Sequence, residues 1–213
     1  MLIYIIRHGE TNANREKRFQ GHQDWPLNDD GRKLADLTGK AMRGIRFDYA
    51  ITSPLLRARE TAETVLRESG NEKTPLAFDD RLKEMHCGVC EGVLCDAAGE
   101  YTEKLKLFFR NPLLYTPEGF PEGETVRQVC DRTQQMLREA AKLPYDSVLL
   151  STHGCAVRAM LNFLYDDPSD FWHGHVPYNC AVNILETDGT HFRFVEEDKL
   201  YYDPALAVDR FKE

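Results

Sequence analysis

Apolar residues along this chain occur in two patterns: short uninterrupted runs, and longer stretches in which they recur every three or four positions. Residues 2–6 and 147–151 are runs rich in Ile, Leu and Val, typical of strands that are covered on both faces. Shorter strand-like runs lie at 49–52 and 76–78, and two more flank Asp188-Gly189, a hairpin signal.

Helical spacing fills the segments between these strands. It extends over residues 28–44, 55–67 and 125–140, and an apolar helix runs through 157–164. Strands that alternate with helices form a mostly parallel sheet with helices on both faces, so the pattern predicts a three-layer α/β fold. At 213 residues, a single domain over 1–213 is the expected organisation.

The helix over 55–67 has its own start signal. Ser53 offers a capping hydroxyl, and Pro54 suits the first helical position. Arg57 then falls in the first turn, where the helix dipole is positive.

Residues 96–122 interrupt this order of elements. The segment begins with helical character and then contains Pro112, Pro117, Gly119 and Pro121 among several aromatic residues. We interpret it as a capping insertion that covers part of a cleft.

Composition and charge narrow the function. With 42% hydrophobic and 29% charged residues, the chain is typical of a soluble globular protein. Its formal net charge of -8 argues against nucleic acid as a partner. The apolar run at 2–6 is too short for a signal peptide or a membrane span, so we expect a cytoplasmic protein without membrane association, and its six cysteines are expected to be reduced.

Two histidines follow the two most apolar strands. His8 comes directly after residues 2–6 and Arg7, and His153 follows the strand at 147–151. In open parallel sheets the ligand crevice lies beyond the carboxyl ends of the strands, so these histidines are expected to meet there. Taken alone, His8 is more often a hydrogen-bonded structural residue than a catalytic one.

The residues that accompany His8 reverse this judgement. Five motifs stand in order along the chain: Arg7-His8-Gly9-Glu10-Thr11 with Asn14, Arg18, Gln20-Gly21, Asp24, Pro26-Leu27 and Gly31; Ser53-Pro-Leu-Leu-Arg57-Ala58 with Thr61-Ala62; Leu82-Lys-Glu84 with Gly88 and Glu91-Gly92; Gly123-Glu124-Thr125; and Thr152-His153-Gly154. This set resembles the signature of the histidine phosphatase superfamily, which includes the cofactor-dependent phosphoglycerate mutases. Five ordered motifs over about 2–164 are far more specific than any one of them.

The resemblance implies a phosphoglycerate mutase-like fold and a complete set of site residues. It implies these catalytic residues: His8, Glu84, Arg7, Arg57 and His153. It also implies these phosphate- or substrate-binding residues: Asn14, Gln20, Gly21 and Gly154. Neither a metal nor another cofactor is expected, and the expected partner is a small phosphorylated metabolite.

Phosphoryl-transfer chemistry suits these residue types. A phosphoryl group in transit spreads negative charge over three oxygens, which arginines and other fixed donors stabilise. His8 must be neutral to attack, and nearby guanidinium charges favour the neutral imidazole. Glu84 is the candidate to protonate the leaving oxygen and then to take a proton from water, which implies a mildly acidic to neutral optimum; Glu91 is a competing acid.

A cysteine pair lies within the acid loop. Cys87 and Cys90, with Cys95 and His86 nearby, have the spacing of a possible zinc or redox pair. No second such pair exists in the sequence, so a metal or redox role is disfavoured. Related phosphatases commonly have an aromatic residue at the position of Cys90, and a cysteine there is expected to alter the shape of the pocket.

Three functions are compatible with this sequence. The first is a phosphatase for small phosphate monoesters, the second a phosphoglycerate mutase, and the third a catalytically silent phospholigand-binding protein. Only about forty residues separate Glu84 from Gly123-Glu124, which resembles the shorter phosphatase branch, so the first is preferred. The sequence does not identify the substrate, and a homodimer is suggested only by the family.

Overall fold

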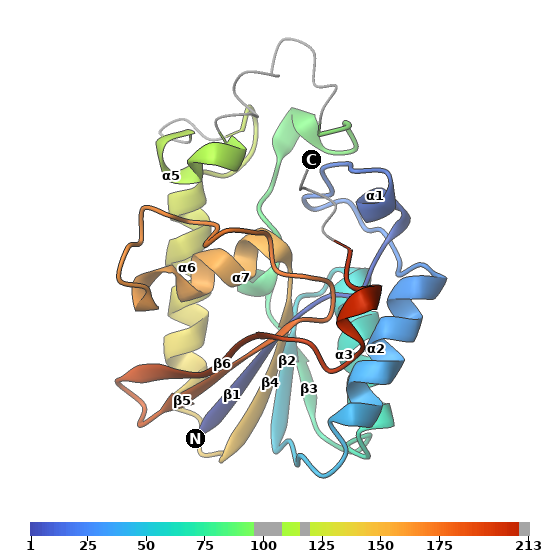
Figure 1. Cartoon of the computed structure of the whole chain (residues 1–213). Coiled ribbons are helices and arrows are strands. Elements are labelled where there is room, and N and C mark those ends of the chain that lie inside the picture. Colours follow the sequence, from blue (N-terminus) through green and yellow to red (C-terminus); the bar gives the residue numbers. More distant parts are fainter. Residues whose placement is uncertain (96–107, 116–119, 209–213) are drawn as a thin grey trace.

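The computed structural model describes residues 1–95, 108–115 and 120–208. A six-stranded sheet in the order β3-β2-β4-β1-β5-β6 forms the centre of the molecule (Figure 1). The strands are β1 (Leu2–Arg7), β2 (Tyr49–Thr52), β3 (Leu76–Phe78), β4 (Ser147–Thr152), β5 (Val182–Thr187) and β6 (Phe192–Lys199). Pairs β1·β4, β2·β4 and β2·β3 are parallel, whereas β5 is antiparallel to both of its neighbours. The mostly parallel sheet and the terminal hairpin are as predicted.

Helices cover both faces of the sheet (Figure 1). On one face lie α2 (Asp29–Ala41) and α3 (Leu56–Glu68), and on the other α6 (Val126–Ala140) and α7 (Gly154–Leu161). The short helices α1 (Asn12–Arg15) and α5 (Pro112–Tyr115) lie beyond the ends of the strands. Short 3-10 turns occupy Asp80–Leu82, Gly88–Cys90, Asn162–Leu164 and Pro204–Leu206. The predicted helix through 157–164 therefore ends as an α-helix at Leu161 and continues as a 3-10 turn.

Alternation along β1 divides the core into two layers. Ile3 and Ile5 pack in one hydrophobic cluster with residues of α6 and α7. Tyr4 and Ile6 pack in another cluster with residues of α2 and α3. Successive side chains of a strand point to opposite faces, so an uninterrupted apolar run is what a sheet covered on both sides requires. This three-layer arrangement confirms the predicted α/β fold.

The start of α3 differs from the prediction. Ser53 does not cap it: the helix begins at Leu56, and its N-cap residue, Leu55, makes no side-chain hydrogen bond. The cap comes instead from a distant residue, because Asp24 Oδ1 accepts the backbone N–H of Leu56 at 2.6 Å. The Ser53 hydroxyl hydrogen-bonds to His153 in the site.

Much of the predicted capping insertion at 96–122 lies outside the described residues. The described parts are residues 108–115, which include α5, and residues 120–122. Phe108 and Phe120 are buried there in a hydrophobic cluster with Phe19. No helix within the described ranges is long and apolar enough to cross a membrane.

Candidate active site

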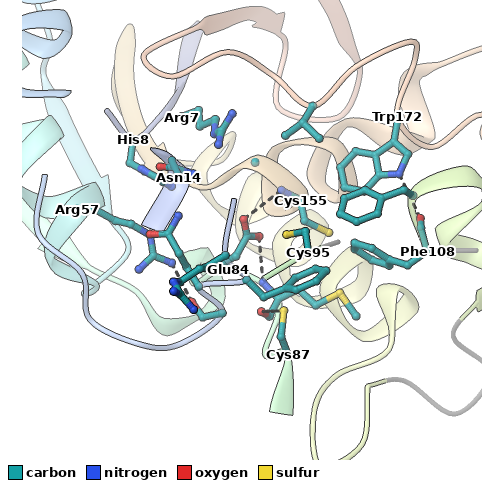
Figure 2. Close-up of a pocket in the computed structure, with 18 residues that line it drawn as sticks. Arg7, His8, Asn14, Arg57, Glu84, Cys87, Cys95, Phe108, Cys155 and Trp172 are labelled. Carbon is teal, nitrogen blue, oxygen red and sulfur yellow. Dashed lines mark hydrogen bonds between the residues drawn. The ribbon is translucent and has the colours of Figure 1, made fainter. Parts of the chain in front are cut away.

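The carboxyl ends of β1 and β4 bring the two histidine motifs together. Arg7 is the register partner of Thr152, and the backbone N–H of His8 donates to the Thr152 carbonyl at 2.9 Å. The imidazole rings of His8 and His153 lie 5.1 Å apart between centroids. One pocket beside them is lined by eight of the nine predicted residues (Figure 2): Arg7, His8, Asn14, Gln20, Gly21, Arg57, Glu84 and Gly154.

His8 is held as a neutral imidazole. Its ring is buried, and Nδ1 lies 2.6 Å from the Gly9 carbonyl oxygen. A carbonyl oxygen only accepts hydrogen bonds, so Nδ1 carries the proton and Nε2 keeps its lone pair. Burial, with the positive charges of Arg57 and Arg7, holds the pKa of His8 well below its ordinary value. The arrangement leaves Nε2 as a nucleophilic atom.

Two buried guanidinium groups face this pocket. Arg7 donates through Nη1 to the Pro177 carbonyl, and Arg57 donates to the carbonyls of Gln23 and Gly21, each at 2.8 Å. Burial lowers the pKa of Arg57 to about 10, which still leaves it protonated at neutral pH. The Nε atoms of Arg7 and Arg57 are buried without a hydrogen-bond partner among the described residues.

His153 adds a third nitrogen of this kind. Its Nε2 lies 2.8 Å from the Ser53 hydroxyl, while its Nδ1 is buried and unpartnered within the described residues. Burial, followed by the charge of Arg57, holds the pKa of His153 well below its ordinary value. Buried donors are normally paired, so the unpartnered Nε atoms of Arg7 and Arg57, which line one pocket, indicate a site for an anion.

Glu84 is fixed by the amino-terminal end of α7. Its Oε2 accepts the N–H of Cys155 at 3.2 Å, and its Oε1 accepts those of Ala156 and Met85 at 3.0 Å. Arg132 also donates to the Glu84 carbonyl at 2.9 Å. The residue follows the 3-10 turn Asp80–Leu82 rather than β3 directly. Figure 2 places its carboxyl group within the pocket, on the way from Arg57 to Cys155.

The polar loop after His8 supplies two carboxamides. Asn14 Oδ1 accepts the backbone N–H of Thr11 at 3.1 Å, and Gln20 Oε1 accepts the Thr11 hydroxyl at 2.9 Å. Because each carboxamide oxygen has this internal bond, the nitrogen is the end of each group that suits an anion.

The two predicted glycines are required by close contacts. A Cβ at Gly154 would lie 2.9 Å from Val176 and 3.3 Å from the Nε of Arg7. Gly21 has a φ of +50°, and a Cβ there would lie 2.0 Å from Glu91 Oε1. A side chain at Gly154 would displace Val176 in the pocket wall, and one at Gly21 would displace the Glu91 side chain and strain the backbone.

The alternative acid, Glu91, has a different role. Its Oε1 accepts the backbone N–H of His22 at 2.8 Å and that of Cys87 at 3.1 Å. It does not line the pocket that contains Glu84. Glu91 therefore joins two loops, and Glu84 is the better candidate for the proton donor.

Sequence reasoning missed a segment that supports the site from the far side. Pro177 accepts the hydrogen bond from Arg7, and Asn179 Nδ2 donates to the His8 carbonyl at 2.9 Å. Trp172 and Val176, from the same connection between α7 and β5, line the pocket. In the sequence, Trp172 and Pro177 are the signals that this irregular segment is ordered.

Three of the cysteines also line the pocket: Cys87, Cys95 and Cys155. Burial raises the pKa of Cys87 and of Cys155 well above the ordinary value. These two groups are neutral thiols, which contribute apolar surface and are weak nucleophiles.

The chain is similar to known proteins over most of its length. The model of the histidine phosphatase superfamily (branch 1) matches residues 3–198. The broad-specificity phosphatase YOR283W of Saccharomyces cerevisiae is 31% identical over 188 residues, which are 86% of this chain and 78% of that protein. The probable phosphoglycerate mutase GpmB of Salmonella choleraesuis is 33% identical over 188 residues, 87% and 85% of the two chains.

Solved structures agree with these sequence matches. YhfR of Bacillus stearothermophilus has a TM-score of 0.84 and 32% identity over 92% of this chain and 96% of that one. A phosphoglycerate mutase from Bacillus anthracis has a TM-score of 0.81 and 25% identity over 94% of each chain. Together with the family model, which extends from β1 into β6, these matches establish that the chain belongs to the histidine phosphatase superfamily.

Proposed function

We propose that the protein hydrolyses small phosphate monoesters through a phosphohistidine on His8, with Glu84 as the proton donor and acceptor. The observation that carries this proposal is that Arg7 and Arg57, whose buried Nε atoms lack a hydrogen-bond partner among the described residues, line the same pocket as His8 and Glu84. A small phosphorylated metabolite is the corresponding substrate. The phosphatase among the relatives supports the same class of reaction.

The first step transfers the phosphoryl group to His8. Nε2 attacks phosphorus as the bond to the alcohol oxygen breaks, and the Glu84 carboxyl gives that oxygen its proton. Arg7 and Arg57 stabilise the charge on the three remaining oxygens through groups that are already in place, so little reorganisation is needed.

The second step returns the enzyme to its starting state. Water attacks phosphorus, Glu84 takes the proton from that water, and the bond between phosphorus and Nε2 breaks. Inorganic phosphate leaves, while the hydrogen bond from Nδ1 to the Gly9 carbonyl keeps Nε2 ready for another cycle.

Phosphoglycerate mutase activity is the second candidate, favoured by the relative that carries this description. A mutase returns the phosphoryl group of His8 to an organic acceptor, whereas a phosphatase gives it to water. Phosphohistidine would therefore be long-lived without an acceptor in a mutase and short-lived in a phosphatase. A silent binding protein is disfavoured because His8, Glu84 and both arginines are present and share one pocket.

Two measurements with p-nitrophenyl phosphate that carries a labelled phosphate test the proposal. The first is release of inorganic phosphate, and the second is acid-labile label on the protein after a rapid quench. Wild type should release inorganic phosphate and carry label on His8, and H8A should lose both. The matched control is H191A, since His191 is exposed in the β5–β6 hairpin. No turnover and no label in wild type would refute the enzyme assignment, and label retained in H8A would refute the nucleophile.

A further inference from the structure

The pocket has two chemically different ends. The phosphate end holds Arg7, His8 and Arg57, whereas the opposite end is apolar. Figure 2 shows Phe108 and Trp172 across the pocket from His8, with Glu84 between the two ends. The apolar residues away from Arg7 and His8 in the lining are Phe19, Phe108, Phe109, Trp172 and Met85. A group bonded to the transferred phosphate on the Glu84 side would extend toward these residues.

The aromatic rings form one packed wall from three parts of the chain. Phe19 stacks on Phe109 with 5.8 Å between ring centroids, and Trp172 meets Phe108 edge-on at 5.6 Å. The Trp172 indole N–H also donates to the Phe108 carbonyl at 3.3 Å. Phe19 and Phe108 are buried, but Phe109 and Trp172 are only partly buried and offer surface to the cavity. The wall is therefore preformed, as ligand pockets usually are.

Beyond Arg7 and Arg57, the described lining of the pocket holds one further cation, Arg18. Arg18 already donates through Nε to Glu16 at 2.6 Å and through Nη1 to the Gly92 carbonyl at 2.8 Å. Arg7 and Arg57 lie at the phosphate end. An added carboxylate would lose water to an apolar surface, which is unfavourable.

We propose that the substrate is a phosphate monoester of an apolar, ring-bearing alcohol, whose ring packs against Trp172 and Phe109. This inference rests on the proposed phosphatase function and specifies its substrate class. A flat apolar group gains both burial and edge or stacking contacts with aromatic side chains, which a small polar alcohol does not. Phosphoglycerates, which carry a carboxylate, should be poor substrates.

Three monoesters with alcohol leaving groups distinguish size from polarity: 2-phenylethyl phosphate, ethyl phosphate and 3-phosphoglycerate. The first two leave as similar primary alcohols, so a difference in kcat/KM reports binding of the ring and not leaving-group acidity. We expect 2-phenylethyl phosphate to exceed ethyl phosphate by about tenfold or more, since one methylene alone is worth roughly tenfold in an apolar pocket. 3-Phosphoglycerate should be the poorest of the three.

Variants locate the preference on the wall. W172A and F109A should each lower the ratio of the two kcat/KM values toward one, and the second variant serves if the first fails to fold. F78A is the matched control, because Phe78 is an exposed ring on β3 that does not line the pocket; it should keep the wild-type ratio.

The outcomes separate this inference from the function on which it rests. Equal kcat/KM values for the ring-bearing and ethyl esters, or a preference for 3-phosphoglycerate, would overturn the substrate class while hydrolysis through His8 stands. A wild-type ratio unchanged in both W172A and F109A would also overturn it. No hydrolysis of any ester and no labelled His8 would instead remove the phosphatase function.

Discussion

The contact between Asp24 and α3 makes a quantitative prediction, because one carboxylate supports both a helix and Arg57, the arginine proposed to bind phosphate. Asp24 accepts the N–H of Leu56 from 32 residues away, and the N-cap residue Leu55 supplies no side-chain cap. The next residue, Arg57, donates back to the Gln23 and Gly21 carbonyls on the same loop. Replacing Asp24 with alanine removes the cap and loosens the contact between the loop and the helix.

Two magnitudes follow from this geometry. Loss of a capping side chain costs about 0.5–2 kcal/mol, and each kcal/mol lowers the Tm of a chain of this size by about 2–4 °C. Arg57 keeps its own two carbonyl bonds, so its displacement should be modest. We expect D24A to bind an oxyanion inhibitor roughly tenfold more weakly, less than the roughly 100-fold cost of a full 1 Å misplacement.

Urea unfolding and inhibition by orthovanadate measure the two effects separately. D24N retains an acceptor oxygen and should lie near wild type in both assays. Thr125 caps α6, because its hydroxyl accepts the Gln128 N–H at 3.1 Å. T125A should therefore lose similar stability without weakening inhibition by orthovanadate. If D24A lost stability while its vanadate affinity equalled that of wild type, the reasoning that couples Asp24 to Arg57 would be wrong.

Three further predictions concern other groups. E84Q should lower kcat by about 10²- to 10⁴-fold while orthovanadate still binds; near wild-type kcat would exclude Glu84 as the acid. D198A should cost about 1–3 kcal/mol in urea unfolding, because the fully buried Arg158 loses its 2.6 Å bond to Asp198 but keeps Glu197 at 3.5 Å and the His175 carbonyl; no loss of stability would show that these remaining partners suffice. Burial depresses the pKa of His8 and of His153 below 6.5. Below that pH the unfolded chain therefore binds more protons than the folded protein. The free energy of unfolding should fall as the pH drops below 6.5, by at most about 1.4 kcal/mol per pH unit for each histidine. The double variant H8Q/H153Q should show a shallower decline, and an identical slope would contradict this assignment.

Several structural features were accessible from periodicity alone. The apolar runs at 2–6 and 147–151 identify the two central strands, and the segments with helical spacing correspond to α2, α3 and α6. Parallel strands end at the same edge of a sheet, so His8 and His153 could be expected to meet before any coordinates were known. The resemblance supplied Glu84 and assigned Arg57 to the site, whereas the local pattern placed Arg57 only in the first turn of a helix.

The start of α3 shows where local patterns fail. Ser53 and Pro54 have the composition of a helix start, yet the Ser53 hydroxyl bonds to His153. A capping preference is worth only about 1 kcal/mol. A tertiary partner such as Asp24, which becomes available when the loop folds back, is enough to override it.

The sequence by itself determined the order of strands and helices and the placement of Arg7 and His8 at a strand end, because these depend on short-range periodicity and on the steric rules of parallel sheets. The tertiary structure alone decided which nitrogen of His8 keeps its lone pair, how Glu84 is held by α7, and how Trp172 closes the apolar end of the pocket. Those features arise from contacts between residues far apart in the chain. Such contacts leave no periodic trace in the sequence, since their energy is gained only when the intervening elements have packed.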